Sequence, residues 1–111
     1  MPTRSCLGEF ELMVMLVLMR LGNDAYGVPI STELHNVTGR EVALGSIYAA
    51  LDRLAQKGFV SSTLGQPTAE RGGRAKRYFH VTQRGVRQVQ TTRATLTSLW
   101  RGIPQLERGT S

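Results

Sequence analysis

Apolar residues recur with helical spacing along the first half of the chain and predict three helices in succession. The first helix spans residue 8 to about 20, because Leu, Met and Glu favour helices and Gly22 with Asn23 ends the run. Its apolar positions cover almost every side: Phe10, Leu12, Met13, Val14, Leu16, Val17 and Leu18. A helix that is apolar all round is buried all round. In a chain of this size, the pattern predicts that a second subunit covers one of its faces.

The next two predicted helices are amphipathic. One spans residue 26 to about 37, with Pro29 in its first turn and an apolar face of Ile30, Leu34 and Val37. The other spans residues 45–59, with Ser46 as its N-cap and Gly58 as a left-handed C-terminal cap. Its apolar face consists of Ile47, Ala50, Leu51 and Leu54. Its opposite face consists of short or polar residues, which let another molecule approach closely: Ser46, Ala49, Asp52, Arg53 and Gln56.

The second half of the chain predicts two strands followed by a long helix. Residues 59–64 and 76–82 are rich in Phe, Val, Thr and Tyr, and the 11-residue segment 65–75 joins them. Thr82 is placed to cap a helix from residue 83 to about 106. Positions three and four residues apart form a seam on that helix, which Thr92 and Pro104 interrupt: Val89, Thr92, Leu96, Leu99, Ile103 and Leu106. Such spacing is typical of a short coiled coil.

The order of these elements predicts a mostly α fold with a two-stranded β wing. Residues 1–82 would form a winged helix-turn-helix domain that binds DNA, and residues 83–111 a C-terminal dimerisation helix. In that arrangement the third helix and the wing present the polar face and the cations. The residues expected at the dimer contact are Phe10, Val14, Val89, Leu96, Leu99, Trp100 and Ile103.

The charge of the chain indicates what kind of partner the predicted fold binds. The chain of 111 residues carries a formal net charge of +6, and 12 of its 14 cations are arginine, which binds phosphate and guanine through its planar fork. Six of those cations fall between residues 71 and 87 with no acid among them: Arg71, Arg74, Lys76, Arg77, Arg84 and Arg87. A nucleotide-binding loop is a poorer interpretation, because the segment joins two strands and lacks the phosphate-loop pattern. The charge therefore predicts a double-stranded DNA partner.

Several other classes of protein are disfavoured. Cys6 is the only cysteine, so no internal disulfide forms, which fits the reducing cytoplasm. The apolar run at residues 12–19 is far shorter than the ~20 residues that span a bilayer. His35, His80 and Cys6 lack metal-ligand spacing, and no set of catalytic side chains stands out. We therefore expect no enzyme activity, no cofactor, no metal and no membrane contact.

The residues alone leave two interpretations of the third helix open. Ser46, Tyr48, Ala49 and Arg53 would contact DNA, with Arg53 pairing with guanine or neutralising a phosphate, or they would simply be a solvated face. Asp52 opposes DNA binding unless it pairs with Arg53 or with a base amine. The alternative function is a winged helix that binds an acidic protein.

Two segments resemble the PadR family of bacterial transcriptional regulators: "LGSIYAALDRLAQKGFV" and "ERGGRAKRYFHVTQRG". The openings "LGEFELMVMLVLMRL" and "AYGVPISTEL" are similar to the first two helices of that family, so the resemblance covers residue 7 to about 88. It implies a winged-helix homodimer that pairs through its C-terminal and first helices. It also implies that Ser46, Tyr48 and Arg53 lie on the recognition helix and that Arg74, Lys76 and Arg77 lie on the wing.

The resemblance also sets expectations for function and regulation. It implies a repressor that reads a palindromic operator as a homodimer. Many members have Pro after the Tyr of this motif, where the present chain has Ala49. Members often respond to small aromatic compounds, and Trp100 is the candidate contact for such an effector. The alternative to an effector contact is that the Trp100 side chain simply packs at the dimer seam.

Overall fold

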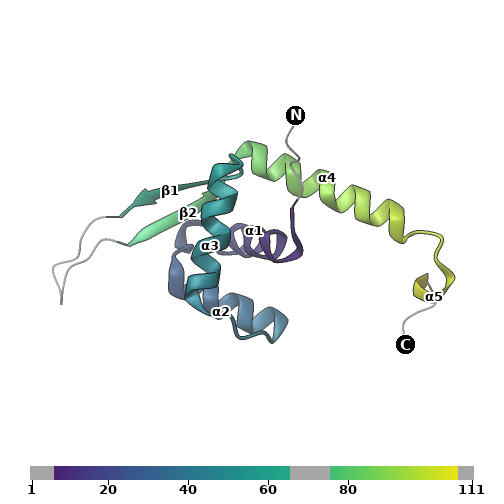
Figure 1. Ribbon diagram of the computed structural model, residues 1–111, viewed down its shortest axis with the longest axis horizontal. Coiled ribbons are helices and arrows are strands. Elements are labelled where there is room, and N and C mark those ends of the chain that lie inside the picture. The colour runs from purple at the N-terminus through teal and green to yellow at the C-terminus, as the bar shows by residue number, and fades with distance from the viewer. Residues whose placement is uncertain (1–6, 66–75, 108–111) are drawn as a thin grey trace.

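The computed structural model describes residues 7–65 and 76–107, and its helices and strands follow the predicted order (Figure 1). The elements are α1 (Glu9–Leu21), the 3-10 turn η1 (Gly22–Asp24), α2 (Gly27–Thr38), α3 (Leu44–Gln56), β1 (Val60–Leu64), β2 (Arg77–Val81), α4 (Gln83–Trp100) and α5 (Pro104–Glu107). The strands form a two-stranded antiparallel sheet. The structure thus confirms the prediction of a mostly α, winged-helix fold.

The core lies where α1, α2 and α3 meet the base of the hairpin. The apolar face predicted for α3 is confirmed, since Ile47, Ala50, Leu51 and Leu54 are each at most 1% exposed. Phe59, just after α3, is 1% exposed and packs into the same cluster. Helix α1 carries apolar residues on almost every side, yet Leu16 and Met19 remain 42% and 44% exposed. One side of α1 is therefore left partly open to solvent by the described residues.

Helix ends are set by the residue types that the sequence offers, with one exception. Gly58 has φ +83°, which only glycine adopts without strain, and it closes the end of α3 as predicted. The Thr82 hydroxyl accepts a hydrogen bond from the Gly85 N–H at 3.0 Å and caps α4. The prediction that Ser46 is the N-cap of α3 is wrong. Ala43 takes that position, because its carbonyl accepts the N–H groups of Ser46 and Ile47.

The prediction of one C-terminal helix to residue 106 is also wrong. Helix α4 ends at Trp100, and Gly102 follows with φ +79°. Pro104 lacks a backbone donor and begins the short helix α5, while the Gly102 N–H donates to the Glu107 carboxylate at 2.7 Å. The predicted seam is therefore broken, and Ile103 lies outside α4.

The hairpin projects from the helical body on the side away from the free end of α4 (Figure 1). Its strands pair from Val60 opposite Val81 to Leu64 opposite Arg77. The Phe79 N–H donates to the carbonyl of Ala25 at 2.8 Å, which attaches β2 to the start of α2. The predicted wing cations Arg71 and Arg74 lie outside the described residues.

Helix α4 crosses the body of the protein at Gly85, which is buried. A Cβ atom at this position would overlap the carbonyl oxygen of Phe59 and would lie 2.7 Å from Val81 Cγ1 and 3.0 Å from Met15 Cε. Only glycine lets the helix backbone come this close to the end of α3 and to β2.

We expect Gly85→Ala to lower the free energy of unfolding by about 2 kcal/mol, because the strain of overpacking exceeds the helix propensity gained. Urea denaturation measures the change. Gly45→Ala is the matched control, since a Cβ there has no atom within 4 Å, and it should leave stability equal or slightly raised. Equal midpoints for Gly85→Ala and the wild type would show that the packing around Gly85 can accommodate a methyl group.

Candidate nucleic-acid interface

The face of α3 that points away from the core is exposed and made of short side chains. Gly45, Ala49, Asp52 and Gln56 follow one another at intervals of four, three and four residues, and all are exposed. Residues at this spacing share one side of a helix. Tyr48 flanks that side toward the wing, and Ser46 and Arg53 flank it toward α1. A face this low lets a helix approach the floor of a groove.

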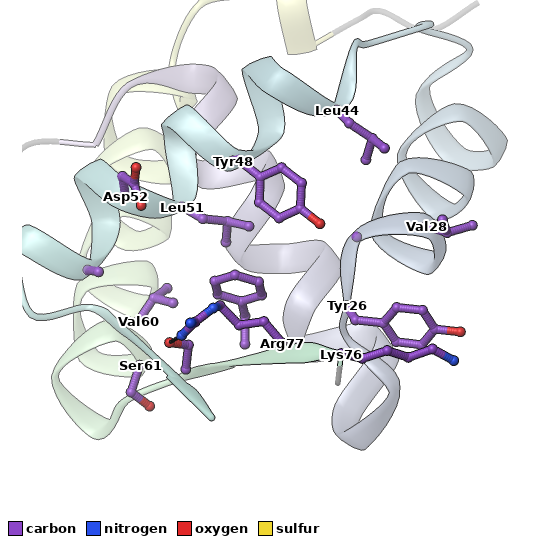
Figure 2. Close-up of a pocket in the computed structure, with 14 residues that line it drawn as sticks. Tyr26, Val28, Leu44, Tyr48, Leu51, Asp52, Val60, Ser61, Lys76 and Arg77 are labelled. Carbon is purple, nitrogen blue, oxygen red and sulfur yellow. Dashed lines mark hydrogen bonds between the residues drawn. The ribbon is translucent and has the colours of Figure 1, made fainter. Parts of the chain in front are cut away.

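A cavity of about 530 Å³ separates this helix from the wing and from the start of α2 (Figure 2). Its polar lining comes from all three elements: Tyr26, Tyr48, Asp52, Ser61, Lys76 and Arg77. Figure 2 shows Tyr48 and Leu51 reaching from α3 toward the strands, with Tyr26 and Lys76 side by side at the opposite edge. The recognition helix and the wing thus border one hollow.

Tyr48, at the flank of the apolar face, is exposed but keeps its ring against the core. The residue is 42% exposed, and its ring lies 6.2 Å from the ring of Phe79. Its hydroxyl occupies the space that a Cβ atom would take at Gly27, the first residue of α2. Glycine at that position therefore lets the Tyr48 hydroxyl sit beside the N-terminus of α2.

The described wing cations are held by neutral partners. The Lys76 ammonium lies 4.6 Å from the centre of the Tyr26 ring, and this ring contacts that of Tyr78 edge to face at 5.3 Å. Arg77 Nη1 donates to Ser62 Oγ at 3.1 Å. No carboxylate in the described part of the chain forms an ion pair with Lys76 or Arg77. Their positive charges are oriented but not neutralised.

Arg53 is instead paired with a buried acid that the sequence analysis missed. Glu11 on α1 is 7% exposed at its side chain, and its carboxylate accepts from Arg53 Nε at 3.0 Å and from Lys57 Nζ at 2.9 Å. The same carboxylate accepts the Gly8 N–H at 3.0 Å. The spacing of Gly8 and Glu11 at the start of α1 fits a capping box, and this was the only signal in the sequence.

The surroundings of Glu11 act on its pKa in opposite directions. Burial raises the pKa of this carboxyl, whereas the hydrogen bonds from Lys57, from the backbone of Gly8 and from Arg53 lower it. The donors outweigh burial, so the pKa lies below its ordinary value of 4.5. Glu11 therefore stays ionised and ties the end of α3 to the start of α1.

The residues predicted at a dimer contact fall into two groups. Val14 and Val89 are 0% and 9% exposed, because both pack in the core of their own chain. For Val14 in particular, no part of the side chain reaches the surface, so it is not a surface contact. Phe10 is half-buried against the same core. The others are exposed: Leu96 40%, Leu99 67%, Trp100 57% and Ile103 37%.

The exposed apolar residues of α1 and α4 border a second cavity of about 770 Å³. Its apolar lining consists of Leu12, Leu16, Met19, Val89, Leu96 and Trp100. Beyond Val89, no residue of α4 is buried against the part of the chain that the structure describes, and the helix extends away from the body (Figure 1).

These features define a winged helix-turn-helix protein whose third helix exposes a face of mostly short side chains and whose wing carries cations. The chain matches the Transcriptional regulator PadR-like family over residues 15–91, and it belongs to that family. It is therefore a DNA-binding transcriptional regulator and not an enzyme.

Solved structures support the fold. The chain is 24% identical to a PadR-like transcriptional regulator from Bacillus cereus strain ATCC 14579, with a TM-score of 0.68, covering 91% of this chain and 93% of that one. It is 25% identical to a PadR family transcriptional regulator from Eggerthella lenta DSM 2243, with a TM-score of 0.66, covering 92% and 88%. It is 18% identical to a PadR family transcription regulator from Clostridium difficile R20291, with a TM-score of 0.68, covering 83% and 91%. A comparison with curated protein sequences gives no match.

Within residues 7–65 and 76–107, no helix combines the length and apolar character needed to cross a membrane. In the same ranges, no three His, Cys, Asp or Glu side chains gather where they could hold a metal ion.

We expect Glu11→Gln to lower the free energy of unfolding by about 1 kcal/mol at neutral pH, since the two cations it pairs with are partly exposed to solvent. The pKa of Glu11 is depressed in the folded state, so its contribution is present above pH 4.5 and is lost as the pH falls through the folded value. Denaturant titrations of both proteins from neutral pH down to about pH 3 measure how the difference shrinks.

Glu9→Gln is the control on the same helix. Glu9 is 79% exposed and lies 3.7 Å from Arg40, so this change should leave stability nearly unaltered. A stability difference for Glu11→Gln that stays constant over the whole pH range would contradict a role of the ionised carboxylate.

Proposed function

We propose that this protein is a homodimeric repressor that reads a palindromic operator, with α3 in the major groove and the wing on the adjacent backbone. The observation that carries the proposal is that Tyr48 and Asp52 of α3 and the exposed cations Lys76 and Arg77 border one hollow. In helix-turn-helix proteins the recognition helix reads base edges and its surroundings grip phosphates. Residues 1–82 would serve DNA binding and residues 83–111 dimerisation, and the protein would act in the cytoplasm.

Within this proposal the contacts divide by chemistry. Ser46 and Ala49 lie on or beside the outward face of α3 and would meet base edges, while Tyr48 would offer its hydroxyl to a phosphate. Arg53 would use the guanidinium nitrogens that Glu11 leaves free, because only its Nε is engaged in the described ion pair. Lys76 and Arg77, together with Arg71 and Arg74, would bind the backbone.

The homodimer is supported by the uncovered apolar surface. The C-terminal half of α4 exposes Leu96, Leu99 and Trp100, and such a segment is poorly stable in water unless its apolar side is covered. The cavity between α1 and α4 is lined by residues of the same kind, so the α4 of a second copy would fill it. A twofold axis would then give each chain the same contact and match a palindromic operator. Trp100 borders this cavity, so it would pack at the dimer seam or, where the partner's α4 leaves space, contact a small aromatic effector.

The proposed function is tested by selecting duplexes from a random library with the purified protein and footprinting the best binder. We expect protection of two symmetric half-sites about 34 Å apart, one helical turn of DNA. The alternative, a winged helix that binds an acidic protein, predicts equal and weak retention of all duplexes. A single protected half-site without symmetry would oppose the palindrome, and activation of a reporter placed behind the selected site would oppose the repressor.

The wing cations have a separate signature in salt. We expect Lys76→Ala and Arg77→Ala each to weaken binding to operator and random duplex alike and to reduce the slope of log affinity against log salt by about 1. Arg20→Ala is the matched control, because Arg20 pairs with Glu33 at 2.7 Å on the α1–α2 side of the molecule. A loss confined to one operator sequence would show that the wing reads bases.

The dimer contact is tested by a charge on its exposed surface. We expect Leu99→Glu to weaken self-association by at least ~2 kcal/mol, from lost apolar burial and the cost of burying a carboxylate. The fold of each chain should be retained, because Leu99 is 67% exposed in the single chain. Sedimentation velocity measures the dimer, and Ser98→Glu, on the other side of α4, is the control. A Leu99→Glu protein that dimerises like the wild type would exclude this surface.

A further inference from the structure

One acid lies at the centre of the surface that faces DNA in the proposed function. Asp52 is the only carboxylate in α3, and it is exposed in the row that runs from Gly45 through Ala49 to Gln56. The two neighbours before it in this row have almost no side chain. Asp52 is therefore the first side chain in this row that carries a charge, and it is accessible from solvent.

No cation in the described part of the chain neutralises Asp52. The nearest cation in sequence, Arg53, donates from its Nε to Glu11 at 3.0 Å, and Lys57 also pairs with Glu11 at 2.9 Å. Asp52 takes part in none of the ion pairs among residues 7–65 and 76–107. Of the two roles that make an acid tolerable on a DNA-binding face, pairing with Arg53 is thus not the one observed. Contact with a base amine is the one that remains.

The chemistry of base edges limits which base an ionised carboxylate accepts. A carboxylate has acceptors and no donor. In the major groove guanine presents N7 and O6, and thymine presents O4, all of which are acceptors. Adenine places its N7 acceptor beside its amine, whereas cytosine presents its N4 amine with no acceptor beside it. An aspartate at a base edge is therefore attracted by cytosine and repelled by guanine and thymine.

We propose that Asp52 is a specificity-determining residue that selects a C·G pair in each half-site of the operator. The inference rests on the proposed function, since it needs α3 in the major groove. Aspartate has a short side chain and reaches a base only if the helix comes close. Gly45 and Ala49 permit that approach, since a Cβ atom at Gly45 would face open space beyond its own helix backbone and chain neighbours. Against other sequences the same charge lowers affinity, because it faces the phosphates without a partner.

The test is duplex selection from a random library by the wild type, Asp52→Asn, Asp52→Ala and the control Asp24→Asn. Asp52→Asn keeps the shape and removes the charge, and Asp24→Asn removes the same charge from the exposed turn η1. We expect the wild type to require a C·G pair at one position of each half-site, with about tenfold weaker binding when it is replaced. Both Asp52 variants should lose that preference alone, while their affinity for random duplex rises a few-fold. Asp24→Asn should keep the preference.

The possible failures can be told apart. Thermal melting should be unchanged in the Asp52 variants, because Asp52 is exposed and takes part in no described ion pair, so a lost preference is not a lost fold. If Asp52→Asn binds all duplexes more tightly but selects the same sequence as the wild type, Asp52 only repels DNA and the inference is overturned while the proposed function stands. If the wild type itself selects no sequence, the proposed function and this inference both fall.

Discussion

The position of the exposed surface of α3 beside the hairpin depends on the burial of the opposite face of this helix. Ile47, Ala50, Leu51 and Leu54 lie against the core, and the helix cannot rotate without exposing some of them to water. The opposite face is consequently committed to the solvent, whatever residues occupy it. Its short side chains are therefore presented in a fixed register beside the hairpin. Burial that stabilises the domain and presentation of a surface to DNA are two results of one amphipathic pattern.

Electrostatics then divides the surface into sides with different tasks. On the side toward α1, Glu11 satisfies Arg53 and Lys57, so part of the positive charge holds the domain together. On the side toward the wing, Lys76 and Arg77 contact an aromatic ring and a hydroxyl, which orient a cation without cancelling it. A polyanion is therefore attracted mainly to the wing side. Asp52 takes part in none of the described ion pairs on either side, and in the proposed function its charge would act on selection among duplexes.

How much of this the sequence reveals depends on the range of each interaction. The apolar face of α3, the cap at Thr82 and the turn at Gly58 follow from local spacing and residue type, and they were predicted. On α2 the spacing carried one position too far, because Ile30 and Leu34 are buried but Val37 is 56% exposed. The start of α3 was not, because Ser46 is a good cap by type but the backbone of Ala43 closes the first turn. The C-terminal helix was predicted to continue past Trp100, because the apolar spacing of the seam persists there. Gly102 and Pro104 nevertheless end the helix. Glu11 and Arg53 are 42 residues apart, and no periodicity connects them.

The crossing at Gly85 makes α4 behave as a lever arm. Its 18 residues measure about 27 Å, and its only firmly held part is the first two turns. A tilt of about 10° at the crossing would carry its far end, about 22 Å from Gly85, through roughly 4 Å, more than the rise of one base pair along DNA. Gly85 lies against the carbonyl oxygen of Phe59 and the side chains of Val81 and Met15, so the packing at these atoms constrains the direction of the arm. In a dimer joined through α4, the distance between the two recognition helices would then be adjusted at a point that contacts neither DNA nor the partner.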